Sequence, residues 1–289
     1  MLYTWVMPFR KPTIITLLLL SIVMSCMAGV VQADGKAGPL PIFDAHIHYN
    51  ADVWEAISPD DAIARLRALG IRRAMVSSTS DEGTQRLYRA DPAFVVPVLR
   101  PYRQRGTLET WMYDESVIPY LRGRLEKYRY AAIGEFHIEG NQAQTPVVRE
   151  VVRLAKEYDL ILHVHSDARA VQFILEQNPD ARILWAHAGF EDAATVRELL
   201  DKQKNLWADL SFRYDVMFKG ELSPRWRQLF VDHADRFLLG MDTYEPLRWL
   251  EIAEVMQWQR SLLAALPDDV AGKIAQHNGE QITRRFDGR

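Results

Sequence analysis

The residues best suited to chemistry in this sequence are histidines and carboxylates at the ends of short, β-branched segments. Six of the eight histidines lie in the C-terminal halves of such segments, or directly after them: His46, His48, His137, His163, His165 and His187. Glu135 and Asp242 occupy similar positions. A buried cluster of imidazoles and carboxylates is costly to desolvate without a cation, so this arrangement predicts a metal site.

The ligand chemistry indicates a divalent metal bound by nitrogen and oxygen. Imidazole and carboxylate without thiolate suit zinc, manganese, iron or nickel. Zinc is the first choice because it binds this set without redox chemistry, and one or two ions are both compatible with it. Such an ion lowers the pKa of a bound water to about 7 and polarises a carbonyl or phosphoryl oxygen. His233 and His277 fall in helical stretches and receive no role.

Alternation along a strand predicts which residues accompany these ligands, because residues i and i+2 share a face. The predicted faces are Ile42, Asp44, His46 and His48; Ile133, Glu135, His137 and Glu139; Ile161, His163 and His165; Ile183, Trp185 and His187; and Leu238, Gly240 and Asp242. We expect these faces to converge at their C-terminal ends.

The elements that must position these residues alternate between strand and helix. The predicted strands are 41–48, 73–79, 94–99, 130–138, 160–165, 182–187, 206–211 and 236–241, and helical patterns include 59–69, 146–158 and 191–202. Eight such units predict a single (β/α)8 TIM barrel, whose active site lies where the strands end. An open doubly wound sheet is the alternative, but no glycine-rich turn follows the first strand.

Residues 1–33 have the pattern of a secretory signal peptide. Arg10 and Lys11 precede an apolar stretch from Ile14 to about Val31, and small residues lead up to Ala33. Alternatives are an uncleaved anchor, or a lipoprotein signal with Cys26 as the lipidated residue. Cleavage after residue 33 leaves a 256-residue domain, 34–289, with net charge −5 and no cysteine. We therefore expect an exported protein, periplasmic or secreted.

The charge composition limits the classes of partner that we expect for this domain. The whole chain carries 35 basic and 38 acidic residues, which gives no general attraction for a polyanion. We expect a small-molecule substrate and no nucleic acid. No membrane association of the mature domain is expected unless Cys26 is lipidated, and no oligomeric state is predicted.

Several motifs, taken together and in order, resemble those of the amidohydrolase superfamily. Phe43-Asp44-Ala45-His46-Ile47-His48 is similar to the opening motif, and Ile133-Gly134-Glu135 resembles the acidic fourth-strand segment of TatD-like hydrolases. His165-Ser166-Asp167-Ala168, Ala186-His187-Ala188-Gly189 and Leu239-Gly240-Met241-Asp242-Thr243 resemble the fifth-, sixth- and eighth-strand segments. Ala208-Asp209-Leu210-Ser211 and Gln276-His277-Asn278-Gly279 are similar to the seventh strand and closing helix of the amidohydrolase-related branch.

The resemblance implies roles for individual residues. His46 and His48 would bind the first metal, and Glu135 would bridge two metals. His187 would be a second-metal ligand or an acid that orients the substrate. Asp242 would be a metal ligand and the catalytic base. The family's carboxylated lysine is absent from 130–139.

The fifth strand leaves one ambiguity, because His163 and His165 share a face. His165 is preferred as the ligand since it is nearer the strand end, and His163 would then support the ligands from one layer deeper.

Loops at the predicted mouth supply candidate substrate-binding residues. Arg103 follows the third strand, Arg213 and Tyr214 follow the seventh, and His137 lies beyond Glu135. Arginine forks suit carboxylate or phosphate, which favours an anionic small substrate. Pairing of these arginines with neighbouring loop carboxylates is an equally simple interpretation.

Three functional hypotheses follow. In the first, the protein is a metal-dependent hydrolase that activates a metal-bound water to attack an amide, lactone or ester, with Asp242 as general base. In the second, it is a metal-dependent decarboxylase, a reaction also found in the amidohydrolase-related branch. In the third, it is a non-catalytic barrel that binds a ligand. Glu135 favours the first hypothesis, because a bridging acid implies a two-metal hydrolytic site.

Overall fold

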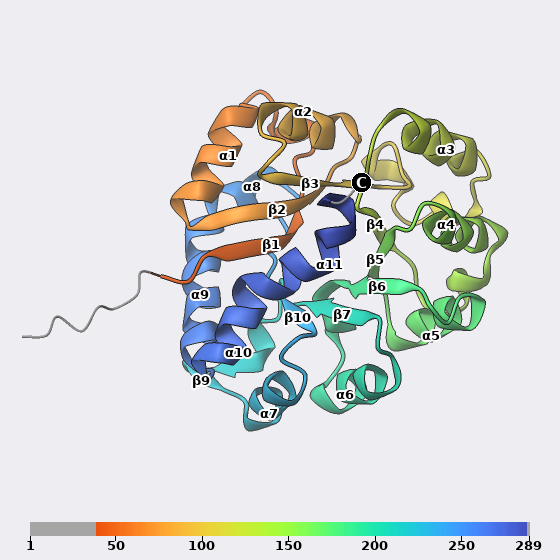
Figure 1. The fold of residues 1–289 in the computed structure, drawn as a ribbon. Coiled ribbons are helices and arrows are strands. Elements are labelled where there is room, and N and C mark those ends of the chain that lie inside the picture. Colours follow the sequence, from red (N-terminus) through yellow and green to blue (C-terminus); the bar gives the residue numbers. More distant parts are fainter. Residues whose placement is uncertain (1–38, 288–289) are drawn as a thin grey trace, which may run out of the picture. The chain divides into compact units, whose positions relative to one another are not determined.

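A computed structural model describes residues 39–287, and it contains the predicted barrel (Figure 1). Eight parallel strands follow one another in the order β1-β2-β3-β4-β5-β6-β7-β10. The predicted signal peptide and Cys26 lie outside the described residues. Among the residues described, no helix has the length and apolar character needed to cross a membrane.

The barrel strands are short, and a small hairpin accompanies them. The strands are β1 (Ile42–Ile47), β2 (Ile71–Ser77), β3 (Val95–Leu99), β4 (Ala132–His137), β5 (Ile161–His165), β6 (Arg182–Trp185), β7 (Leu206–Asp209) and β10 (Phe237–Leu238), with the hairpin β8 (Met217–Phe218) and β9 (Glu221–Leu222). The sixth, seventh and eighth barrel strands end two or three residues before the predicted ends. The residues between the observed and the predicted strand ends belong to the segments that leave the sheet.

Helices follow the barrel strands and surround them in Figure 1. They are α1 (Pro59–Ala68), α2 (Glu82–Ala90), α3 (Val117–Lys127), α4 (Pro146–Glu157), α5 (Ala168–Gln177), α6 (Ala193–Lys202), α7 (Pro224–Asp232), α8 (Pro246–Leu250), α9 (Ile252–Ala264), α10 (Asp268–Gly272) and α11 (Asn278–Asp287). Ser58, Thr145 and Asp192 cap three of them by accepting backbone N–H bonds from the first turn. The helices predicted at 59–69, 146–158 and 191–202 are therefore confirmed.

The last strand meets the first and brings the barrel to closure. Asp44 forms an isolated parallel bridge with Leu239, and the Ala45 N–H donates to the Leu239 carbonyl at 2.8 Å. One step further on, the Asp242 N–H donates to the His46 carbonyl at 2.7 Å. Closure therefore sets Asp242 directly beside the first-strand histidines.

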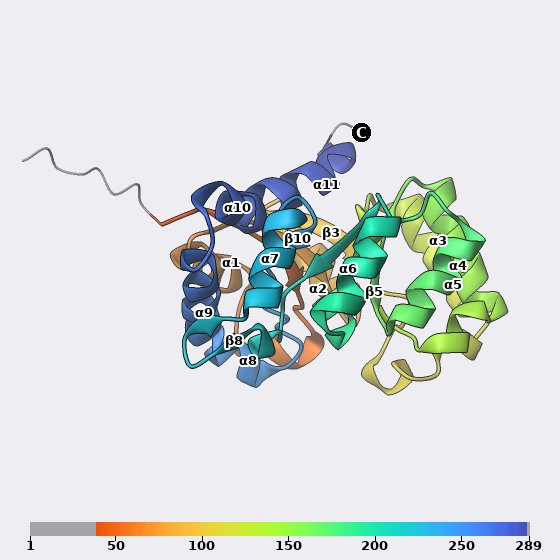
Figure 2. The same cartoon turned by 90° about the horizontal axis from the view of Figure 1, so that it is seen from below.

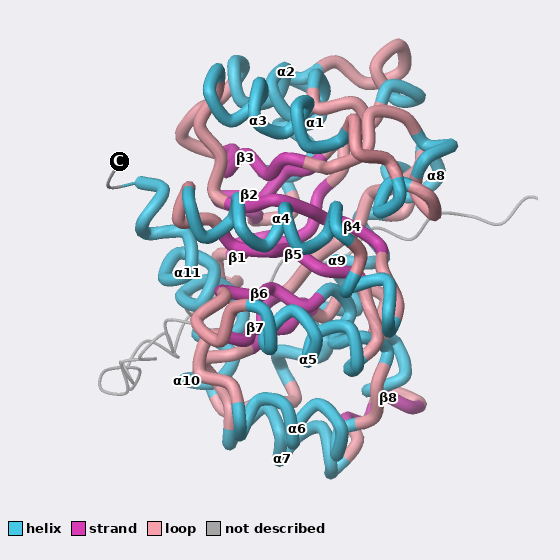
Figure 3. The backbone as a smooth tube through the Cα atoms, turned by 90° about the vertical axis from the view of Figure 1, so that its right-hand side faces the viewer, coloured by secondary structure: helices cyan, strands magenta, loops and turns pink. Residues whose placement is uncertain are grey.

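One end of the barrel is filled by apolar side chains and covered by α11. Phe43, Val96 and Leu184 pack in one cluster with Ile282 and Phe286 of α11. Figures 2 and 3 show α11 at one end of the strands and α8 at the opposite end. A Cβ built on Gly279 of α11 would lie 2.1 Å from the Phe43 ring, so the helix backbone rests directly on that ring. Because α11 covers one end of the barrel, a site is expected at the opposite end, near α8.

The predicted strand faces are correct for β5 and β10 and wrong for β1, β4 and β6. Ile161 and Leu238 pack inside the barrel as expected. However, the residues that pack inside the barrel are Phe43 and Ala45 on β1, Ala132 on β4 and Leu184 on β6. Each of them alternates with the residues of the predicted face. The register shifts between Asp44 and Ile47 and between Gly134 and Phe136, so strict alternation does not hold through these bulged strands.

Candidate metal centre

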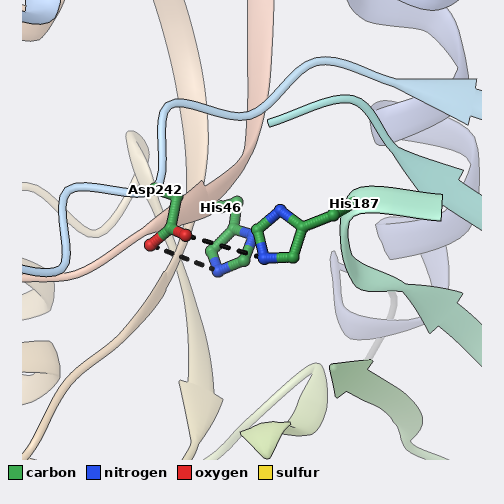
Figure 4. A group of neighbouring side chains, drawn as sticks. All are labelled: His46, His187 and Asp242. Atoms are coloured by element: carbon green, nitrogen blue, oxygen red, sulfur yellow. Dashed lines mark ion pairs between the residues drawn. The ribbon is translucent and has the colours of Figure 1, made fainter. Parts of the chain in front are cut away.

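A cavity of about 450 Å³ opens where the barrel strands end. Five predicted site residues line it: Glu135, His137, His165, His187 and Asp242. His46 and His48 are buried just beneath, at 1% and 0% exposure. Figure 4 shows His46, His187 and Asp242 converging from three separate segments. The structure therefore gathers every predicted metal ligand at one place.

Four donor atoms lie close together in this cluster, and His46, His48 and Glu135 form one of its candidate metal-binding groups. The His46 and His48 Nε2 atoms are 3.0 Å apart. Glu135 Oε2 lies 3.3 and 3.2 Å from them, and Asp242 Oδ1 lies 3.7 and 3.1 Å from them. Metal–ligand bonds of about 2.0–2.2 Å place neighbouring ligand atoms roughly 3.0–3.6 Å apart. We call these four atoms the first donor set.

Hydrogen bonds on the far side of three histidine rings, those of His46, His48 and His187, orient their Nε2 atoms toward the mouth. The Nδ1 atoms of His48 and His187 lie 2.6 and 3.0 Å from the carbonyls of Ser77 and Ser211. A carbonyl only accepts, so each Nδ1 carries a hydrogen and each ring turns its Nε2 toward the mouth, where it can bind a metal ion. His46 Nδ1 faces Asp209 in the same way, at 3.2 Å. Lone pairs this close repel one another unless a proton or metal ion lies between them.

A second donor set lies on the other oxygen of Glu135. Glu135 Oε1 is 2.9 Å from His165 Nδ1 and 3.6 Å from the Nε2 atoms of both His187 and His137. Glu135 thus turns one oxygen to each set, which is the arrangement expected of a bridging carboxylate. Asp242 likewise reaches the second set, since its Oδ2 lies 3.7 Å from His187 Nε2.

The charges in this cluster reinforce one another. Burial by itself would raise the pKa of Asp242, but the neighbouring imidazoles of His46 and His48 outweigh it and lower that pKa to about 2. Burial opposes protonation of His46, yet Asp242, Glu135 and Asp209 raise its pKa above the ordinary value. Asp242 Oδ1 is buried without a hydrogen-bond partner among the described residues. The pocket therefore keeps carboxylates ionised and favours positive charge at its centre.

Asp209 supports the ligands, and the sequence-based assignment gave it no role. Its Oδ2 faces His46 Nδ1 at 3.2 Å and His163 Nε2 at 3.1 Å. Its Oδ1 accepts from the backbone N–H groups of His187 and Ser211. These contacts join three strands below the donor atoms. Asp209 lies in the C-terminal half of the predicted strand 206–211 and ends β7, so the rule that selected Asp242 could have found it.

The two histidines of β5 have different surroundings. His165 lines the cavity, whereas His163 is buried on Asp209 with its ring centroid 4.6 Å from that of His46. Burial lowers the pKa of His163 to about 4, so the ring is neutral at ordinary pH. The geometry thus places His165 with the donors and His163 one layer deeper.

The position of His187 at the mouth does not follow from strand alternation. β6 ends at Trp185, and the next residues form a left-handed turn at 187–190, with φ of 56°, 48°, 63° and 55°. This conformation costs roughly 1–2 kcal/mol for each residue that is not glycine. A Cβ on Gly189 would lie 2.1 Å from the Trp185 ring, so the turn is folded tightly over that indole.

Three predicted substrate-binding residues lie away from the cavity. Arg103 is half exposed and pairs with Asp114 at 3.0 Å. Arg213 is only 1% exposed and makes two hydrogen bonds with Asp215, and Tyr214 packs on Trp258. Both arginines therefore pair with local carboxylates, as the alternative interpretation had it, and the prediction that they bind substrate at the mouth is wrong.

Other residues form the cavity walls. Arg100 donates to Glu135 Oε2 at 2.6 Å, and Arg105 pairs with Asp52 at 3.1 Å and donates to the Tyr244 carbonyl. The aromatic and apolar part of the lining consists of Leu108, Phe190, Phe212 and Tyr244. Arg100 and Arg105 belong to the same loop segment as Arg103, and only the folded chain shows which arginines turn inward.

The fold and the donor geometry define a (β/α)8 barrel with a candidate metal centre at its mouth, and solved structures share this fold. No protein-family model and no curated protein sequence matches the chain. An uncharacterised TIM-barrel protein from Bordetella bronchiseptica is similar at 15% identity and TM-score 0.58, covering 86% of this chain and 100% of that one.

Two further similar structures carry functional descriptions. A probable 2-pyrone-4,6-dicarboxylic acid hydrolase from Acinetobacter baumannii, with citric acid bound, is 11% identical with TM-score 0.56, covering 85% and 100% of the two chains. An amidohydrolase from Burkholderia multivorans with bound zinc is 13% identical with TM-score 0.54, covering 84% and 99%. The resemblance to amidohydrolases is thus confirmed for the barrel fold.

Proposed function

We propose that this protein is a metal-dependent hydrolase of the amidohydrolase superfamily that acts on a small anionic amide, lactone or ester. The observation that carries the proposal is the first donor set. In it the Nε2 atoms of His46 and His48 lie 3.0 Å apart, and oxygens of Glu135 and Asp242 lie 3.1–3.7 Å from them. Zinc is the metal we propose, in line with the nitrogen and oxygen donors and the zinc-bound fold relative.

The chain's own residues would orient the substrate and move the proton. When bound, a divalent ion supplies Lewis acidity that polarises the substrate and lowers the pKa of water. Asp242, with a pKa of about 2, is ionised at neutral pH and faces the cavity, so it can accept a proton there. His187 Nε2 lies 3.7 Å from Asp242 Oδ2 and is well placed to orient the reacting group.

The cavity walls favour a small substrate with one charged and one apolar part. The Arg105 side chain is 55% exposed at the cavity and can donate further hydrogen bonds to a carboxylate. Arg100 is committed to Glu135 and buried, so it is less available. The aromatic wall of Phe190, Phe212 and Tyr244 would contact the apolar part.

One contact keeps a decarboxylase as the second candidate. Arg100 lies 2.6 Å from Glu135 Oε2, the oxygen that faces the first donor set, and partly neutralises it. This weakens Glu135 as a bridge between two ions. A single-ion site that orients a carboxylate-bearing substrate would then suffice for loss of carbon dioxide.

Metal content and product analysis test the proposal together. The purified protein would be measured for bound metals, then assayed with small lactones, esters and amides that carry a carboxylate. Two ions and hydrolysis lost in Asp242→Asn would support the hydrolase. One ion with carbon dioxide release would support the decarboxylase, and no bound metal under metal-replete conditions would contradict both.

We also propose that the domain is exported, on the basis of residues 1–33 alone. Intact mass of the protein recovered from the cell envelope and medium would distinguish cleavage near Ala33, lipidation at Cys26 and an uncleaved anchor. The partner proposed for the mature domain is a small molecule.

A further inference from the structure

The buried guanidinium of Arg213 touches the chain on both sides of the left-handed turn. Its Nη1 donates to the His187 carbonyl at 3.1 Å, and its Nη2 donates to the Glu191 carbonyl at 2.9 Å. These two carbonyls mark the start of the turn 187–190 and the residue after it. One rigid, planar group thus fixes the separation of the turn's ends.

The guanidinium is itself held from two other directions. Asp215 accepts from its Nε and Nη2, each at 2.8 Å, and the ring of Trp226 lies 4.4 Å from its central carbon. Arg213 is 1% exposed and does not line the cavity. Its hydrogen bonds therefore restrain the backbone of this turn, and the side chain does not contact the cavity in which a substrate would bind.

We infer that Arg213 is a positioning residue that sets the ring of His187 for the second donor set; the inference rests on the proposed function. Three non-glycine residues in the left-handed region would relax to ordinary conformations without an external restraint. Relaxation would carry His187 Nδ1 away from the Ser211 carbonyl, now 3.0 Å from it, and free the ring to change tautomer. Its Nε2 would then no longer face Glu135 Oε1 and Asp242 Oδ2.

The test compares Arg213→Met with a partly buried arginine that makes similar hydrogen bonds. Arg236 Nη1 also donates to two backbone carbonyls, those of Gln203 and Leu206, and the residue lies near the Trp207 ring just before β10. Arg236→Met therefore controls for the loss of a structural guanidinium at the other end of the barrel.

Two readouts on the full-length protein separate positioning from general stability. Zinc titration against a competing chelator should show Arg213→Met weakening the second ion about 10–100-fold and the first ion little, with Arg236→Met near wild type. In the metal-free protein, at a pH high enough for the His187 ring to be neutral, ring-nitrogen NMR should show one Nδ1–H tautomer in wild type and a mixture in Arg213→Met. Arg213→Lys, which keeps a donor, should restore part of both.

A double-mutant comparison makes the inference specific to His187. In a His187→Asn background, Arg213→Met should change the remaining zinc affinity less than twofold. If Arg213→Met fails to fold, Asp215→Asn loosens the same guanidinium and serves in its place. Unchanged His187 tautomer and zinc affinity in the folded variants would overturn the inference while leaving the proposed function intact. No zinc binding by wild type, with the tautomer still perturbed by Arg213→Met, would defeat the proposed function alone.

Discussion

At the α11 end of the barrel the space between the strands is filled by Phe43, Val96, Leu184 and the α11 side chains, whereas the opposite end holds His46, His48, Glu135, Asp209 and Asp242. The residues named here are almost fully buried at both ends. The apolar end gains stability from burial. The polar end pays a desolvation cost that hydrogen bonds and, in our proposal, a cation offset.

This contrast predicts that changes at the two ends affect different measurements. Substitutions among the polar residues should remove activity or metal while the domain stays folded. Substitutions among the apolar residues should lower the free energy of unfolding while the metal site stays intact.

The largest effect is expected at the polar end, for Asp242→Asn. Loss of a general base costs roughly 10²–10⁴-fold in rate, and the amide also weakens the first donor set. Hydrolysis of the best carboxylate-bearing substrate is the measurement, with the exposed Asp114→Asn as control. Circular dichroism should show the same fold, and near-normal turnover would contradict the assigned base.

The matching change at the apolar end is Phe43→Ala. Phe43 is 1% exposed beneath Gly279, so truncation should lower the free energy of unfolding by about 3–5 kcal/mol. Urea denaturation measures this, with Phe218→Ala, 74% exposed, as the control. Metal content of the folded variant should equal that of wild type. A loss of metal equal to that of Asp242→Asn would show that the two ends are not separable.

Asp209→Asn tests the layer between the two ends. Residues that orient metal-binding histidines typically change metal affinity by 10–100-fold. Asp209 contacts both His46 and His163, so we expect a loss in that range, measured by zinc competition titration. His233→Asn, which breaks an outer pair with Asp201, is the control. Wild-type affinity in Asp209→Asn would remove it from the site.

Substitutions of Arg103 and Arg105 test the role of the cavity wall in substrate binding, and a smaller effect is expected from them. Arg105 lines the cavity and Arg103 does not, so Arg105→Ala should raise KM for anionic substrates by roughly tenfold, about the worth of one charge-assisted hydrogen bond. Arg103→Ala should leave KM unchanged. Equal effects of the two substitutions would mean that loop charge matters more than placement.

The smallest effect on stability is expected on α4, outside both ends of the barrel. Hydrogen bonds from Arg153, together with Arg122, lower the pKa of Glu150 on α4 to about 2 from an ordinary value of 4.5. A lowered pKa stabilises the fold above pH 4.5, and that contribution is lost as pH falls from 4.5 towards 2. Glu150→Gln should slightly flatten the dependence of the unfolding midpoint on pH below 4.5, and an unchanged dependence would contradict this assignment.

Much of the site could be predicted because barrel topology sends every strand end to one mouth. Strand-end placement predicted the cluster, and the motif resemblance implied which members are ligands: His46, His48, Glu135, His165, His187 and Asp242. All six are gathered there. The arginines were harder, because loop side chains follow no period. Arg103, Arg105 and Arg213 are the same residue type on mouth loops, yet one faces solvent, one the cavity and one a buried turn.

The sequence by itself determined the alternation of strands and helices, and with it the end of the barrel where polar residues meet. Hydrophobic periodicity and residue type are local, so they can be read along the chain. Only the tertiary structure decided which side chains face inward past the bulges of β1 and β4, and how the left-handed turn delivers His187. These depend on contacts between distant segments, such as Arg213 with the His187 carbonyl, that no local pattern encodes.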